Sequence, residues 1–286
     1  IVAVGGDDVL LIVPADKALE VVTTLCKTFE EKLKHKYPAK QGYKPKSAYR
    51  YHPESMPEEH QSQGQLSMSA GMLITAQNTP FYYAEDLTSQ LMKSAKKRAK
   101  SLKKNVHYYG GTVDFLVMRS VTMISSDVAQ FRKQGLTNTQ AGHRLKQYAA
   151  PYTLYELEAL LETAQALKAA EFPRSQLYQI RSLLERGKQT AILNYRYFRL
   201  RLASKAAQQE LETIFEKGWC YPRDERNGGN LAPWMSYKEK DPLDKTQERT
   251  AYETLWRELV DLYPFIEFPK TTAADSETVS AEEVRP

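Results

Sequence analysis

The chain opens on two short apolar runs, residues 1–4 and 9–13, which are separated by the turn Gly5-Gly6-Asp7-Asp8. Runs of β-branched residues around a glycine-led turn predict a β-hairpin. Glycine accepts the positive φ of a tight turn and leaves the backbone open to a closely approaching ligand. We therefore expect two adjacent carboxylates at the tip of a buried hairpin.

Beyond the hairpin, apolar residues recur first at helical and then at strand spacing. The pattern predicts a helix, a strand with an internal glycine, a second helix and a last strand, over about 16–37, 66–74, 87–102 and 113–118. The order strand, strand, helix, strand, helix, strand favours a mixed α+β domain with one sheet and helices on one face.

The second half of the chain changes to a helical pattern. A capping box at Thr153 and Glu156 begins one helix, and the last predicted helix carries Tyr252 and Trp256. No strand pattern interrupts this half. We expect three parts: an α+β domain, an all-α helical domain and a disordered acidic tail, over 1–135, 142–268 and 271–286.

Composition limits the number of domains, the class of partner and the cellular compartment. The 286 residues suffice for about two domains, and a net charge of +5 does not by itself indicate a nucleic-acid partner. Cys26 and Cys220 lie far apart, which argues against a disulfide framework and a cysteine zinc site and favours a reducing compartment. No apolar run approaches the roughly 20 residues of a membrane span. We expect a cytoplasmic protein without a membrane partner, and residues upstream of Ile1 in the parent chain.

Asp7 and Asp8 are the first candidates for chemistry. Two acids at a buried hairpin tip require a cation, because uncompensated buried charge is costly. Hard oxygen ligands suit Mg²⁺ or Mn²⁺, with phosphate completing the shell. A solvated turn uses the same residue types, so these residues alone leave both interpretations open.

Basic residues gather on two predicted helices. Lys96 and Lys97 belong to a lysine-rich run, 93–104, whose basic and apolar residues fall on different helix faces. Such a run is either a solvated face or a contact for polyphosphate. Aromatic residues and arginines interleave over 195–201, which suits either a core face beside a basic surface or base stacking.

These motifs resemble, in chain order, those of one family. Residues 1–12 resemble the palm hairpin of the large subunit of CRISPR type III effectors, the GGDD polymerase-cyclase family. The segment S-M-S-A-G-M at 67–72 resembles its S-A-G-I strand, and 80–97 its lysine-bearing helix. Segments 151–157 and 172–178 resemble its C-terminal helical domain. The resemblance covers about residues 1–265 and implies the C-terminal portion of such a subunit.

The resemblance implies a fold and an activity. The fold is a ferredoxin-like palm of the nucleotidyl cyclase and polymerase type, incomplete at its N-terminus, followed by an all-α helical domain. The activity is conversion of ATP to cyclic oligoadenylate when target RNA binds. Asp7 and Asp8 are then catalytic ligands of Mg²⁺ or Mn²⁺. The nucleotide-binding residues are Gly5, Gly6, Ser69, Lys96 and Lys97.

The resemblance also implies partners. These are the guide CRISPR RNA and target RNA of a multi-subunit complex in a prokaryotic cytoplasm, with small helical subunits docking on 142–268. The family's strand before the hairpin, with its own acid, is absent here, so we expect the fragment alone to be inactive. Two alternatives stay open: a GGDEF-like signalling nucleotide cyclase, and a catalytically silent scaffold subunit of an RNA–protein complex.

Overall fold

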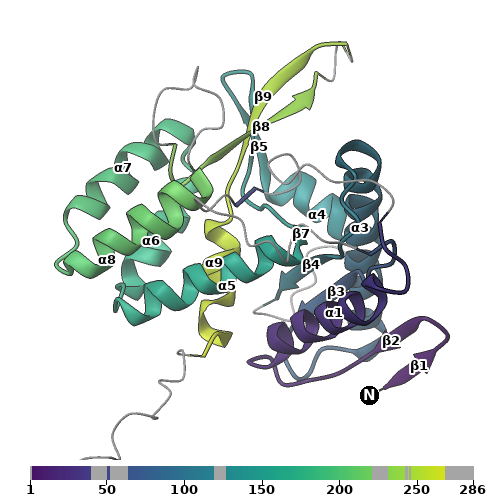
Figure 1. Ribbon diagram of the computed structural model, residues 1–286. Coiled ribbons are helices and arrows are strands. Elements are labelled where there is room, and N and C mark those ends of the chain that lie inside the picture. The colour runs from purple at the N-terminus through teal and green to yellow at the C-terminus, as the bar shows by residue number, and fades with distance from the viewer. Residues whose placement is uncertain are drawn as a thin grey trace, which may run out of the picture.

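The computed structural model describes residues 2–39, 50–51, 64–118, 127–220, 231–241, 244 and 246–267. In these ranges the chain forms sheets of two, three and four strands with helices packed around them (Figure 1). The predicted mixed α+β class is confirmed. The predicted acidic tail, 271–286, lies outside the described residues.

The predicted N-terminal hairpin is present, but it is not buried. Strands β1 (Ala3–Gly5) and β2 (Asp8–Leu10) pair antiparallel, with Gly5 opposite Asp8. Gly6 has a φ of +61°, which glycine adopts without strain. Val4 is 65% exposed and Val9 is 50% exposed. Burial was predicted wrongly because the two strands pair with no third strand among the described residues, so their apolar side chains stay open.

The next elements form a strand–helix–strand unit. Helix α1 (Ala18–Lys34) follows the hairpin, and strands β3 (Ala70–Ile74) and β4 (Thr112–Val117) pair in parallel around helix α3 (Phe81–Val106). A Cβ at Gly71 would collide with the backbone of α3 at Thr88 and Met92. The internal glycine of the predicted strand therefore permits close approach of β3 to the backbone of α3.

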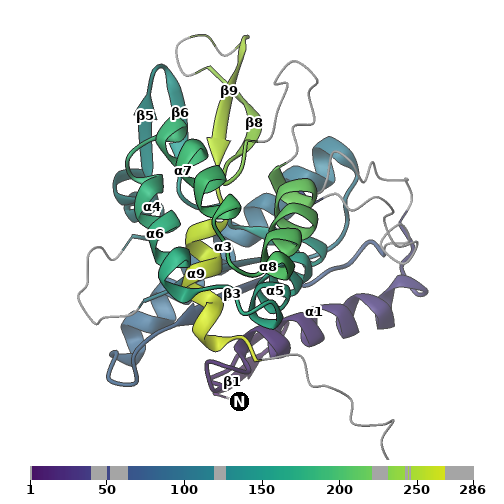
Figure 2. The same ribbon diagram turned by 90° about the vertical axis from the view of Figure 1, so that its left-hand side faces the viewer.

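The second half contains strands that the sequence did not predict. Helix α4 (Val128–Gly135) leads into β5 (Thr137–Gln140) and β6 (His143–Lys146), and β8 (Met235–Lys240) and β9 (Glu248–Glu253) come later. They form one sheet in the order β5-β6-β9-β8, whose two hairpins project from the body (Figure 2). The prediction that 142–268 is all-α is therefore wrong, because β6, β8 and β9 lie within this range. The residues of these strands are mostly polar, so the strands lack the apolar alternation that marks a strand.

Helices still make up most of the second half. They are α5 (Leu154–Ala169), α6 (Arg174–Leu184), α7 (Lys188–Leu200), α8 (Lys205–Glu210), a π-helical segment (Leu211–Cys220), α9 (Trp256–Leu262) and a 3₁₀ turn (Tyr263–Phe265). The predicted capping box at Thr153 and Glu156 is present. Tyr252 was predicted in the last helix but lies in β9. The prediction was wrong because the four-residue spacing from Tyr252 to Trp256 also fits a helix.

One hydrophobic core joins the two halves. A short strand, β7 (Tyr152–Thr153), pairs antiparallel with β4 and so extends the β3–β4 sheet. The Phe115 ring stacks on the Tyr152 ring, with centroids 5.8 Å apart, and Tyr152 meets Trp219 edge-on. Whether 1–135 and 142–268 are separate domains stays a prediction, but their apolar side chains share one buried cluster.

Candidate functional site

The two aspartates stand at the exposed tip of the β1–β2 hairpin. Asp7 lies in the two-residue turn with Gly6, and Asp8 is the first residue of β2. The Asp8 side chain is 69% exposed, so the expectation that buried charge demands a cation does not hold here. Their carboxylate chemistry remains the basis for a metal-binding role, which stays a prediction.

The structure brings Asp8 together with Lys96 of α3. The apolar stripe Leu87, Leu91 and Ala95 is buried, which turns the lysines of the helix outward. The Nζ atom of Lys96 lies 3.8 Å from Oδ1 of Asp8. Two predicted site residues 88 positions apart in sequence are therefore neighbours in space. Because both side chains are largely exposed, their ion pair contributes only about 0–1 kcal/mol.

Lys97 borders the same surface, whereas Ser69 points elsewhere. A shallow hollow of about 290 Å³ is lined by Lys93, Lys96, Lys97 and Lys100. The Ser69 hydroxyl lies 3.5 Å from the Thr112 hydroxyl, which itself donates to the Ala95 carbonyl. Ser69 thus lies at the start of the β3–β4 pair, and its side-chain contact is with β4 and not with the hairpin.

The glycines leave the turn open. A Cβ at Gly5 or Gly6 would meet no described atom within 4 Å. Gly6 is required by its positive φ, whereas the surrounding protein does not require Gly5. This open backbone leaves room for a nucleotide to approach. The nucleotide-binding role of Gly5 and Gly6 stays a prediction.

The aspartate pair fits a divalent cation as part of a ligand set. Within the described ranges, no group of three or more His, Cys, Asp or Glu side chains could hold a metal ion. Mg²⁺ in nucleotide sites commonly takes one or two carboxylates plus substrate phosphates and waters. Asp7 and Asp8 can supply that share, and phosphates are the natural source of the remainder.

A buried ion network fixes helix α3, and no sequence pattern indicated it. Arg98 turns away from the lysines, and its guanidinium lies 2.9 Å from Oε2 of the fully buried Glu156. Arg50 pairs with the same carboxylate and with Glu253 of β9, at 3.2 and 3.0 Å. The capping box marked Glu156 only as a helix start. Its second role depends on residues 58 and 106 positions away.

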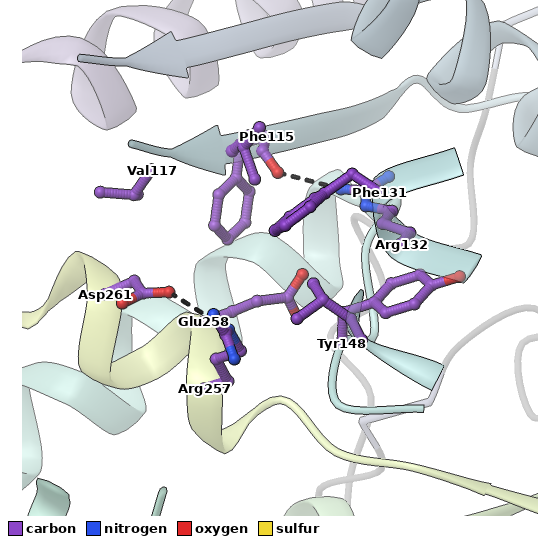
Figure 3. A pocket seen from close by; sticks show the side chains of 10 residues that line it. Phe115, Val117, Phe131, Arg132, Tyr148, Arg257, Glu258 and Asp261 are labelled. Atoms are coloured by element: carbon purple, nitrogen blue, oxygen red, sulfur yellow. Dashed lines mark hydrogen bonds and ion pairs between the residues drawn. The ribbon is translucent and has the colours of Figure 1, made fainter. Parts of the chain in front are cut away.

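The pocket in Figure 3 is a structural junction and not a nucleotide site. It lies between β4, α4 and α9, and Phe115, Arg132, Tyr148 and Glu258 are among its lining residues. Its volume is about 50 Å³, whereas ligand pockets hold roughly 300–1,000 Å³. Arg132 forms two 2.7 Å bonds to the buried Asp114. Burial raises the pKa of Glu258, whose carboxylate accepts from the Ala149 amide.

The predicted basic face of the helical half is partly neutralised within the chain. Arg199 lies 3.0 Å from Glu216, and the Arg201 guanidinium stands 4.8 Å over the Tyr197 ring. The Glu216 carboxylate thus offsets the charge of Arg199, one of the arginines interleaved over 195–201. Within the described part of the chain, no helix is long and apolar enough to cross a membrane.

Comparison with known proteins identifies the N-terminal region. Residues 1–107 match the family model of Cas10/Cmr2, second palm domain. No curated protein matches the chain. The matched region contains the hairpin and α3, which bring Asp8 and Lys96 together, and also α1 and β3.

Proposed function

We propose that residues 1–107, which match the second palm domain of Cas10/Cmr2, belong to the large subunit of a type III CRISPR effector. We further propose that their aspartate hairpin joins ATP into cyclic oligoadenylate in the intact effector. The observation that carries this proposal is the 3.8 Å approach of Lys96 to Asp8. It places acids that suit a divalent cation beside an ammonium group that suits phosphate, and a nucleoside triphosphate with its metal needs both.

The proposed reaction is a nucleotidyl transfer. A ribose 3′-oxygen attacks the α-phosphorus of a second ATP, which forms a new P–O bond and breaks the bond to the bridging oxygen. Pyrophosphate leaves, and the hydroxyl proton passes to solvent. Mg²⁺ or Mn²⁺, when bound, stabilises the attacking and leaving oxygens.

The residues of this chain then bind and orient. Asp7 and Asp8 offer carboxylate oxygens at a tip that no described side chain covers. Lys96, and Lys97 beside it, donate to phosphate oxygens and offset the charge that develops on the leaving pyrophosphate. Gly6 holds the turn in its left-handed conformation, and Ser69 supports the strand beside α3.

The partners follow from the family. Type III effectors are multi-subunit complexes, so we infer a guide CRISPR RNA, a target RNA and small helical subunits that dock on 142–268. Helix α7 supports a docking role, because its exposed face carries Leu193, Tyr197 and Leu200 at helical spacing, 64%, 49% and 70% exposed. Exposed apolar patches of this kind mark interaction surfaces.

The decisive experiment compares Asp7→Asn/Asp8→Asn with wild type in the assembled effector. With ATP, Mg²⁺ and target RNA, we expect the variant to assemble normally and to make no cyclic oligoadenylate, because the ligands are lost without disturbing packing. The matched control is Glu85→Gln/Asp86→Asn, two adjacent exposed acids at the start of α3, which should retain activity. Undiminished product from the hairpin variant would place the synthesis at another site of the effector and end the proposal.

A further inference from the structure

The outer side of α3 carries more positive charge than one nucleotide requires. Within the twelve residues 93–104 there is no acid. Six lysines of this segment are exposed and form what we call the lysine stripe: Lys93, Lys96, Lys97, Lys100, Lys103 and Lys104. At 1.5 Å rise per residue the stripe extends over about 16 Å.

Most of the stripe has no partner among the residues that the structure describes. Lys96 meets Asp8, and the Lys103 ammonium stands 5.0 Å from the centre of the Tyr109 ring. The other four lysines form no ion pair or ring contact with described residues. Arg98, in the same segment, is instead committed to Glu156. The stripe therefore presents a nearly uncompensated positive surface.

An ordinary solvated helix face does not account for this arrangement. Lysines three or four positions apart are neighbours on a helix, and like charges there are destabilising. Lys96, Lys97 and Lys100 each have such neighbours in both directions along the stripe. Solvated faces usually intersperse charges of both signs. The helix dipole favours cations only in the last turn, which explains Lys103 and Lys104 but not the lysines before them. A polyanion bound along the stripe would relieve the repulsion.

The position of the stripe indicates which polyanion fits. It meets the hairpin where Lys96 faces Asp8, its hollow lies between Lys93, Lys96, Lys97 and Lys100, and it continues to the end of the helix. A triphosphate at Asp8 would engage one or two of these lysines. The lysines beyond it are placed for successive phosphates of a strand that leads away from the hairpin.

We propose that the lysine stripe binds the phosphate backbone of the linear oligoadenylate that the hairpin elongates. This inference rests on the proposed function, since the strand is its intermediate. Contacts to phosphates are independent of sequence and sensitive to salt. The stripe would retain the growing strand between additions, so that its loss shortens the products.

The test is fluorescence anisotropy of a short, dye-labelled linear oligoadenylate with the full chain, measured from low to high salt. The variant is Lys100→Gln/Lys103→Gln/Lys104→Gln, which spares the lysines nearest Asp8. The matched control is Lys32→Gln/Lys34→Gln/Lys36→Gln at the end of α1, because it removes the same charge and Lys36 also stands over a tyrosine ring. Each single-strand phosphate contact contributes about 0.7 to the slope of log affinity against log salt.

We expect the stripe variant to bind more weakly and to lose about 2 from the magnitude of that slope, whereas the control keeps the wild-type slope. Asp7→Asn/Asp8→Asn should bind the oligoadenylate as wild type does, which separates this inference from the hairpin chemistry. Equal slopes for variant and control would overturn the inference. Binding of a long RNA of mixed sequence without binding of the short oligoadenylate would overturn it too, and would assign the stripe to another strand.

Discussion

The buried carboxyl group of Glu30 is predicted to make the free energy of unfolding depend on pH. Its carboxylate accepts a 2.5 Å hydrogen bond from the Gly111 amide, which ties α1 to the turn before β4. Burial, opposed by this bond and assisted by the nearby Glu158 charge, raises the pKa of Glu30 from 4.5 to about 7. Between pH 4.5 and about pH 7, the folded protein thus holds Glu30 mostly neutral, whereas the unfolded chain carries the anion.

The sign and size of the effect depend on this shift. A carboxyl whose folded pKa is raised contributes stability that is fully present below pH 4.5 and is lost as pH rises through 7. At about 1.4 kcal/mol per pKa unit, the loss is at most about 3 kcal/mol. Glu30→Gln keeps an acceptor for the Gly111 amide and stays neutral. We expect it to match wild type near pH 4.5 and to be up to about 3 kcal/mol more stable at pH 8.

Urea unfolding followed by circular dichroism at both pH values measures the difference between variant and wild type. Taking that difference cancels the other groups that titrate over this range. Glu31→Gln, an exposed neighbour on the same helix, is the control and should show no pH-dependent gain. A stability difference for Glu30→Gln that is equal at pH 4.5 and pH 8 would refute the reasoning.

Three further predictions concern α3, its strand and the helical half. Lys96→Ala should raise the Michaelis constant for ATP in the assembled effector, whereas Lys32→Ala on α1 should not; equal constants would remove Lys96 from the site. Gly71→Ala should destabilise the chain by about 1–3 kcal/mol in urea unfolding, because its Cβ would collide with the α3 backbone, and unchanged stability would contradict the close approach. Arg196→Glu/Arg201→Glu should weaken effector assembly more at low salt than at high salt, since exposed charges are screened; salt-independent assembly would place the docking surface elsewhere.

Local sequence patterns predicted the parts of the fold whose signals are local. The hairpin was predicted from its glycine-led turn, and α5 from its capping box. Strand β3, with its internal glycine Gly71, was predicted from the spacing of its apolar residues. Each of these depends on residues within a few positions of one another, so periodicity and turn chemistry suffice.

Features that depend on distant residues were missed. Strands β8 and β9 hold one another by backbone pairing across their loop, and their polar side chains carry no strand signal. The exposure of the hairpin could not be predicted, because apolar alternation marks a face without saying what covers it. In the candidate site, Asp8 and Lys96 were both named from sequence, but only the packing of α3 shows that they meet. The sequence does not distinguish Arg98, whose side chain reaches the buried Glu156, from the exposed lysines around it.

The shared carboxylate of Glu156 ties helix α3 to the second half of the chain. Arg98 of α3 and Arg50 both depend on that one acid, which belongs to the first turn of α5. A protein shortened at residue 141 would keep both guanidinium groups and lose their counter-charge, and it would uncover the Phe115 ring that Tyr152 now covers. We therefore expect the shortened protein to be less stable than the full chain, because a buried charge without its partner is costly.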